Sequence, residues 1–92
     1  MTEQQRVRVV VSGRVQGVWF RETTRRTAEA VGATGWVRNA PDGTLEAEVQ
    51  GTPAAVERVV AFVHSGPPLA EVAEVRVQPV EAVDAEDGFA VR

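Results

Sequence analysis

The sequence contains no cysteine and no lysine, and each absence excludes a class of chemistry. Without cysteine there is no disulfide, no thiolate nucleophile and no zinc site built on cysteine ligands. Without lysine there is no Schiff base and no Walker-type phosphate loop, which needs a lysine to reach the nucleotide phosphates. Arginines, carboxylates, amides and backbone groups remain as the carriers of function.

Long apolar runs are also absent. No stretch approaches the roughly 20 apolar residues of a membrane-spanning helix, and the polar start Met1-Thr2-Glu3-Gln4-Gln5 does not resemble a leader peptide. We therefore expect a soluble, cytoplasmic protein, with which the lack of cysteine agrees. The 92 residues suffice for one small domain, 1–92, with its own core.

Positive charge is scarce and local. The formal net charge is −3, and all ten basic residues are arginines. No basic stretch is long enough to follow a nucleic acid backbone, so we expect no nucleic-acid partner. A small anionic ligand is favoured instead, because several arginines gather near one glycine-containing segment: Arg14, Arg21, Arg25 and Arg26.

Hydropathy periodicity predicts the element order β-α-β-β-α-β with a short fifth strand. Helices are predicted from about residue 20 to 32 and from Pro53 to the stop signal Gly66-Pro67-Pro68, with Thr52 as the N-cap of the second. The strands are predicted at 6–12, 35–39, 44–50, about 70–80 and 88–92.

Two helices with one apolar face each have to cover one face of a mostly antiparallel sheet, which is the ferredoxin-like α+β sandwich. A right-handed crossover makes the first two strands parallel, with the third between them. Alternation predicts that Ala73, Val75 and Val77 of the fourth strand face the core. In the third strand it predicts Leu45, Ala47 and Val49 toward the core and Thr44, Glu46, Glu48 and Gln50 toward water. We interpret Glu46 and Glu48 as a solvated strand face, which disfavours an RNA-binding module of this fold, since such modules carry aromatic residues there.

The segment between the first strand and the first helix is the candidate functional element: Ser12-Gly13-Arg14-Val15-Gln16-Gly17-Val18-Trp19-Phe20-Arg21. Gly13 and Gly17 allow a sharp turn that brings consecutive N–H groups to one side, where they can surround an anion. The helix N-terminus adds partial positive charge, and Arg21 adds a planar fork that matches two phosphate oxygens. An ordinary strand-to-helix turn, with Arg21 in a surface ion pair, is the alternative.

Asn39 ends the second predicted strand at the same edge of the sheet as this loop. Two strand spacings separate the loop and Asn39 by about 10 Å, so side chains from both can meet on one small anion. Asn39 has a second interpretation, as an Asx residue that opens the turn Pro41-Asp42-Gly43.

Two stretches resemble the signature motifs of the acylphosphatase family: Gly13-x-Val15-Gln16-Gly17-Val18-x-Phe20-Arg21 and Gly35-Trp36-Val37-Arg38-Asn39-x-x-x-Gly43-x-Leu45. The resemblance extends to chain length, element order and Gly51. Leu45 departs from the valine usual in the family, and Ala40 replaces the hydroxyl residue of some members.

The resemblance implies a metal-independent enzyme without a cofactor that hydrolyses acyl phosphates to a carboxylate and inorganic phosphate. By motif position it implies that Arg21 binds the phosphate and that Asn39 orients the attacking water. The backbone N–H cradle is implied to come from Arg14, Val15, Gln16, Gly17, Val18 and Trp19. The expected partner is a small-molecule acyl phosphate, with phosphate or sulfate as a product-like ligand, and the expected state is a monomer.

This reaction needs no general acid, because the leaving carboxylate, with a pKa of about 4, departs unprotonated. That agrees with a single histidine, His64, at the far end of the second helix. We interpret Trp19 and Trp36 as packing residues, with Trp19 close enough to the loop to shape a pocket mouth. A non-catalytic module that binds phosphate on the same fold is the alternative function.

Overall fold

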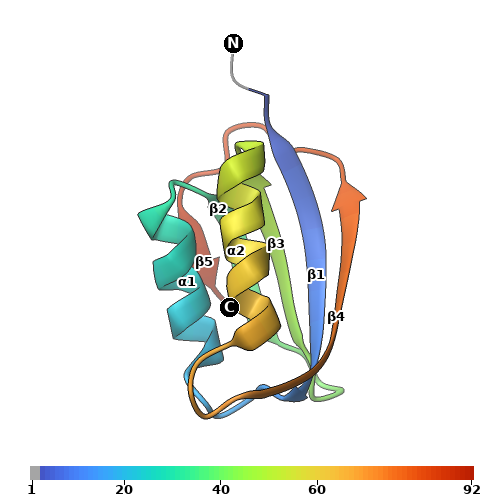
Figure 1. Ribbon diagram of the computed structural model, residues 1–92. Coiled ribbons are helices and arrows are strands. Elements are labelled where there is room, and N and C mark those ends of the chain that lie inside the picture. The colour runs from blue at the N-terminus through green and yellow to red at the C-terminus, as the bar shows by residue number, and fades with distance from the viewer. Residues whose placement is uncertain (1–2) are drawn as a thin grey trace.

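The computed structural model describes residues 3–92, which form a five-stranded sheet with two helices side by side on one face (Figure 1). The elements follow the predicted order: β1 (Gln5–Arg14), α1 (Phe20–Ala30), β2 (Thr34–Asn39), β3 (Leu45–Gly51), α2 (Pro53–Ser65), β4 (Glu71–Val80) and β5 (Phe89–Val91). No helix within residues 3–92 is long and apolar enough to cross a membrane.

The strand order is β4-β1-β3-β2-β5, and β3 is antiparallel to both β1 and β2. The first two strands are therefore parallel with the third between them, and the predicted ferredoxin-like fold is confirmed. β4 is antiparallel to β1 at one edge, and β5 is parallel to β2 at the other. Because β1 and β2 run in the same direction, the loop after β1 and the last residue of β2 lie at the same end of the sheet.

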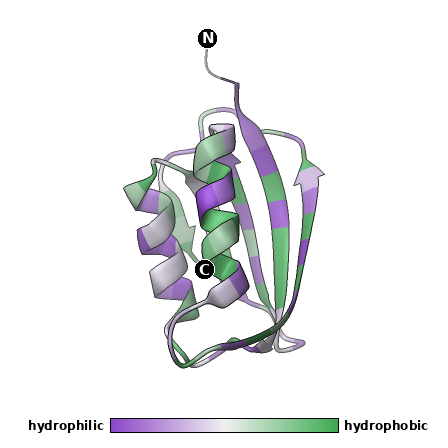
Figure 2. Cartoon of the chain, viewed as in Figure 1, coloured by the Kyte–Doolittle hydropathy of each residue, from purple (hydrophilic) through white to green (hydrophobic). Residues whose placement is uncertain are grey.

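Apolar residues alternate along the strands and form a stripe on each helix, and Figure 2 shows this pattern as green and purple bands. The fully buried side chains come from both layers and include Val9, Val11, Phe20, Leu45 and Val59. Phe20 and Phe62 join the two helices by an edge-to-face contact with ring centroids 5.9 Å apart. α2 begins as predicted, since Thr52 Oγ1 accepts a hydrogen bond from the Ala55 N–H at 3.2 Å.

A β-bulge corrects the predicted facing of β4. The β1–β4 register shifts between Ser12 and Gly13, so that Gly13 pairs with Val72. As a result Val72 packs against the core while Ala73, predicted to face inward, is exposed. Gly13 has a φ of 116°, and a Cβ there would clash with the carbonyl oxygen of Glu71 and lie 2.7 Å from the Ala73 nitrogen. Only glycine fits this point.

The prediction that Glu46, Glu48 and Gln50 face water is wrong. The Glu46 and Glu48 side chains are only 13% and 20% exposed, and Gln50 is buried. The neighbouring strands place arginines beside them, so Arg8 donates to Glu46 at 2.6 Å and Arg38 Nε donates to Glu46 at 2.7 Å. Charge pairing across three strands covers the carboxylates that alternation alone assigns to solvent.

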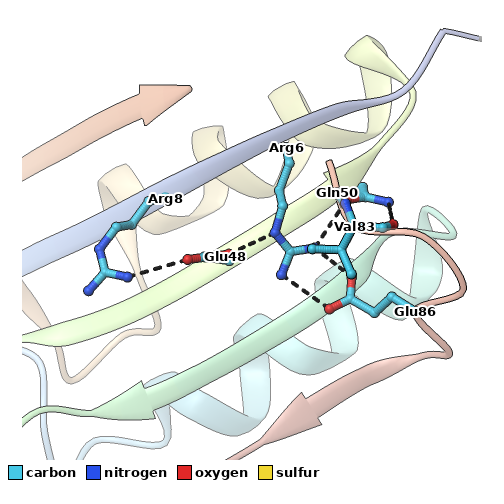
Figure 3. Close-up of polar contacts among 6 residues, drawn as sticks. All are labelled: Arg6, Arg8, Glu48, Gln50, Val83 and Glu86. Atoms are coloured by element: carbon cyan, nitrogen blue, oxygen red, sulfur yellow. Dashed lines mark hydrogen bonds and ion pairs between the residues drawn. The ribbon is translucent and has the colours of Figure 1, made fainter. Parts of the chain in front are cut away.

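Arg6, near the start of β1, makes a second set of polar contacts at the opposite end of the sheet from the β1–α1 loop (Figure 3). Its guanidinium, 4% exposed, donates to Glu48 at 2.7 Å, to Gln50 at 3.1 Å and to both Glu86 oxygens at 2.8 and 3.2 Å. Gln50 in turn accepts from the Val83 N–H at 2.8 Å and donates to the Val83 carbonyl at 2.9 Å. We call these five residues the Arg6 clamp, and they tie the β4–β5 connection to the sheet.

The clamp shifts the pKa of both of its strongest partners. The hydrogen bonds that Arg6 donates to Glu86 raise the pKa of Arg6 despite its burial. Burial alone would raise the pKa of Glu86, but the hydrogen bonds with Arg6 and Thr34 and the nearby charges of Arg6 and Arg92 together outweigh it, so the pKa lies below its usual value. Both groups are therefore held in their charged forms.

Candidate functional site

A pocket of about 360 Å³ opens at the end of the sheet where β1 and β2 finish. It is lined by Val15, Gly17, Trp19, Phe20, Arg21, Glu22, Asn39 and Val91. The structure therefore brings the two predicted catalytic residues, Arg21 and Asn39, to one pocket together with part of the glycine loop. Of the other loop residues predicted to bind phosphate, Arg14, Gln16 and Val18 are not among the lining residues.

The loop between β1 and α1 is held from both sides. Val15 and Val18 are buried in the core and anchor its backbone to the layer between sheet and helices. Gln16 Nε2 donates to the carbonyl oxygens of Ala40 and Thr44 at 2.8 and 3.1 Å, which ties the loop to the β2–β3 hairpin. Gly17, with a φ of 74°, makes the turn between these anchors.

The backbone N–H groups of this loop are the second feature of the site. Within residues 3–92, none of the N–H groups of residues 15–19 donates a hydrogen bond to another backbone group. The Trp19 carbonyl accepts from the Thr23 N–H at 3.1 Å and so starts α1. The loop thus presents free donors next to a helix N-terminus, which favours an anionic ligand.

Arg21 lies in the first turn of α1 and is exposed. Its Nη1 donates to the main-chain oxygen of Arg92 at 3.3 Å, and within residues 3–92 it forms no ion pair with a side-chain carboxylate. The alternative that Arg21 serves a surface ion pair is therefore not observed. Its charge is available at the pocket.

Two other arginines near the loop, Arg25 and Arg26, differ from Arg21. Arg25 contacts Glu22 and Glu29 at 2.6 and 2.8 Å, and Arg26 contacts Glu22 at 3.0 Å. Hydrogen bonds from Arg25, and then from Arg26, lower the pKa of Glu22 to about 2. Glu22 is therefore ionised at neutral pH and, together with Glu29, pairs with these two arginines rather than leaving them for a ligand.

Asn39 is the last residue of β2, and its Oδ1 is buried without a hydrogen-bond partner in residues 3–92. Asp42 makes the turn contacts instead: its Oδ1 accepts from the N–H and the hydroxyl of Thr44 at 3.0 and 2.7 Å. The alternative that Asn39 opens this turn is therefore not observed. An unpaired buried acceptor costs about 1–3 kcal/mol, which makes its position in a pocket informative.

Two of the residues that line the pocket were not identified from the sequence, and the prediction for a third was partly wrong. Val91 reaches the pocket because β5 pairs with β2, a contact that no local motif indicates. Glu22 lines the pocket, although no motif position indicates it. Trp19 lines the pocket, in agreement with the expectation that it shapes a pocket mouth, but it does not pack as predicted. It is 74% exposed because the residues on either side of it, Val18 and Phe20, take the buried positions.

The remaining histidine and the acidic residues do not add a second centre. His64 lies in the last turn of α2, exposed, with Nδ1 2.9 Å from the Val60 carbonyl oxygen, as predicted for a helix-terminus residue. In the part of the chain that the structure describes, no three His, Asp or Glu side chains are grouped closely enough to hold a metal ion.

Comparison with known proteins agrees with both motifs. A family model described as Acylphosphatase matches residues 7–91. An acylphosphatase of Rubrobacter xylanophilus is 51% identical over 90 residues, covering 98% of this chain and 82% of that one. An acylphosphatase of Anaeromyxobacter dehalogenans is 47% identical over 92 residues, covering 100% and 99%. The structure of an acylphosphatase from Coxiella burnetii superposes with a TM-score of 0.90 at 36% identity, covering 97% and 93%. The chain belongs to the acylphosphatase family.

Proposed function

We propose that this enzyme hydrolyses acyl phosphates in the pocket formed by the glycine loop, α1 and the end of β2. The observation that carries the proposal is that one pocket is lined by both Arg21, which has no ion pair with a side chain within residues 3–92, and Asn39, whose side-chain oxygen is buried and unpaired there. Arg21 has a single hydrogen bond of 3.3 Å to a main-chain oxygen, and the Asn39 oxygen has none within residues 3–92. A bound phosphoryl group and a water would satisfy both.

Arg21 and the loop N–H groups bind the phosphoryl oxygens. The guanidinium offers two parallel donors, and the N–H groups of Arg14, Val15, Gln16, Gly17, Val18 and Trp19 are the proposed cradle. The N-terminus of α1 adds about half a positive charge at the same point. Phosphoryl transfer asks chiefly for such fixed positive charge around the equatorial oxygens.

Asn39 holds the water that attacks phosphorus in line with the leaving group. As the new P–O bond forms, the bond between phosphorus and the carboxylate oxygen breaks, and the water proton passes to a phosphate oxygen. The carboxylate leaves unprotonated because its pKa is only about 4. We propose that no metal or cofactor takes part.

The buried position of Asn39 Oδ1 implies a small movement during this step. For Oδ1 to accept a hydrogen bond from the attacking water, the carboxamide has to turn about χ2 when substrate binds. The χ2 angle of asparagine is broad and roughly two-fold, so this turn is accessible. It also relieves the unpaired acceptor, so binding of the water is favoured by the site itself.

The test is hydrolysis of benzoyl phosphate by the purified protein with EDTA present. Arg21→Gln is expected to lower turnover at least about 100-fold, the scale for losing one transition-state donor, with an unchanged circular dichroism spectrum. Arg58→Gln removes an exposed arginine from α2 and serves as the matched control, with turnover unchanged. Equal turnover in Arg21→Gln would refute the phosphate-binding role.

The non-catalytic alternative is not favoured, because the curated relatives are themselves named acylphosphatases. We propose further that the chain acts as a cytoplasmic monomer on a small-molecule substrate. The support is that a single chain brings Arg21 and Asn39 to one pocket. Light scattering after size-exclusion chromatography is expected to give a mass near 9.9 kDa.

A further inference from the structure

Trp19 is a large apolar side chain that the fold leaves outside its core. It is 74% exposed, and the aromatic contact between the helices is made by Phe20 and Phe62 instead. Its backbone is also strained, with φ 68° and ψ 14° in the left-handed region, where a bulky residue is an outlier. Neither packing nor backbone preference explains a tryptophan at this position.

The exposed ring lies at the pocket that holds Arg21 and Asn39. Val91, at the end of β5, is 41% exposed and lines the same pocket. The other apolar lining residues, Val15 and Phe20, are buried in the core. Trp19 and Val91 are therefore the large apolar side chains of this pocket that a ligand can still cover.

The chemistry of an acyl phosphate matches a pocket with two unlike parts. Its phosphoryl end carries the negative charge and belongs with Arg21 and the loop donors. Its acyl end is uncharged, and in an aromatic acyl phosphate it is flat and apolar. Desolvating such a group against Trp19 and Val91 is favourable, whereas the methyl group of acetyl phosphate has little surface to bury.

We propose that Trp19 and Val91 form an acyl-binding wall and that this enzyme prefers aromatic or bulky apolar acyl phosphates over acetyl phosphate. The inference rests on the proposed function and adds a substrate class to it. The acyl-binding wall also explains the strained backbone of Trp19. The left-handed conformation turns the ring out of the core, between two buried neighbours, Val18 and Phe20.

The experiment compares kcat/KM for benzoyl phosphate and acetyl phosphate. In Trp19→Ala the loss on benzoyl phosphate is expected to exceed the loss on acetyl phosphate about 10-fold or more, chiefly through KM, because an apolar contact is lost. Trp19→Phe keeps an aromatic ring and is expected to retain most of the preference, and Val91→Ala to lower it less than Trp19→Ala does. Trp36→Phe is the control, since Trp36 lies outside the pocket lining, and its ratio is expected to match the wild type.

An unchanged ratio in Trp19→Ala would overturn the acyl-binding wall. This failure differs from failure of the proposed function, in which the wild type cleaves neither substrate.

The chain contains two tryptophans, so fluorescence gives an independent measurement. In Trp36→Phe, where Trp19 is the remaining tryptophan, the non-hydrolysable probe benzoylphosphonate is expected to change the emission in a saturable way. In Trp19→Phe, where Trp36 remains, the emission is expected to stay constant. A constant emission in Trp36→Phe, at probe concentrations that inhibit turnover, would overturn the proposal.

Discussion

Asn39 and Asp42 lie in the same hairpin, yet their side-chain oxygens have opposite effects on stability. Asp42 Oδ1 accepts two hydrogen bonds from Thr44, and these lower the pKa of Asp42. Asn39 Oδ1 is buried and unpaired within residues 3–92. A residue that costs stability and lines a pocket is typical of a functional site, where local rules are broken for activity.

Asn39→Ala is expected to lower kcat about 100-fold, because the attacking water loses its orientation. The inhibition constant of inorganic phosphate is expected to change little, since Arg21 and the loop remain. The melting temperature is expected to stay equal or to rise, because the unpaired acceptor is removed. Steady-state kinetics and thermal melts measure all three.

Asp42→Ala provides the matched control with the opposite pattern. Asp42 lies outside the pocket lining, and the substitution removes its hydrogen bonds within the turn. The variant is therefore expected to have a lower melting temperature and an unchanged kcat. If Asn39→Ala keeps the wild-type kcat, the water-orienting role is wrong.

At the scale of elements, the Arg6 clamp joins parts of the chain that no local interaction connects. Arg6 belongs to β1, its partners Glu48 and Gln50 to β3, and Val83 and Glu86 to the β4–β5 connection (Figure 3). The five residues of the Arg6 clamp stabilise this arrangement together, because each buried polar group depends on its partners for hydrogen bonds. Removing one member leaves buried partners without hydrogen bonds.

Arg6→Met is expected to destabilise the protein by about 3 kcal/mol or more, because Glu48 and Glu86 lose a buried cation. Arg8→Met is the control: Arg8 also pairs with Glu48 but is 34% exposed, and such pairs contribute about 1 kcal/mol or less. Denaturant unfolding measures both differences. Equal losses in the two variants would show that burial of Arg6 does not decide its contribution.

At the scale of the whole molecule, stability depends on acid because several carboxyl groups have a lower pKa in the folded protein. The pKa of Glu22 falls from 4.5 to about 2, and the pKa values of Asp42 and Glu86 also fall. A carboxyl group with a lowered folded pKa stabilises the folded state above its unfolded pKa. That stabilisation is lost as the pH falls through the folded pKa.

The free energy of unfolding is therefore expected to be flat near neutral pH and to fall as the pH decreases from 4.5 to about 2. Glu22→Gln is expected to show a shallower fall over the same range. Added salt is expected to reduce the difference between the two proteins, because the Glu22 pairs are accessible to solvent. Urea unfolding at a series of pH values measures this, and parallel curves would contradict the role of Glu22.

Much of the fold was predictable because its signals are local. Alternation in the strands, the Thr52-Pro53 start of α2 and the glycine and proline stops depend on a few neighbouring residues, and element order and strand pairing followed from them. The bulge at Gly13 was not predictable from alternation, since one extra residue reverses the facing of everything beyond it. This is why Ala73 was assigned to the core in place of Val72.

The candidate site likewise has features that the sequence predicted and features that it did not. The loop and Asn39 were predictable, because both follow parallel strands whose ends meet. Alternation cannot indicate what covers the outer face of a strand, so the pairing of Glu46 and Glu48 with arginines was missed. Nor can it indicate that β5 returns beside β2 and brings Val91 to the pocket.

That return of β5 gives the pocket two parts that different stretches of the chain encode. The proposed phosphate-binding groups lie in the motifs around Gly17 and Asn39, whereas Val91 arrives on a strand held through the β4–β5 connection. On the proposals made above, a substitution at Val91 is expected to change which acyl group is accepted while the motif residues stay as they are. A new substrate range would then require no rebuilding of the reaction centre.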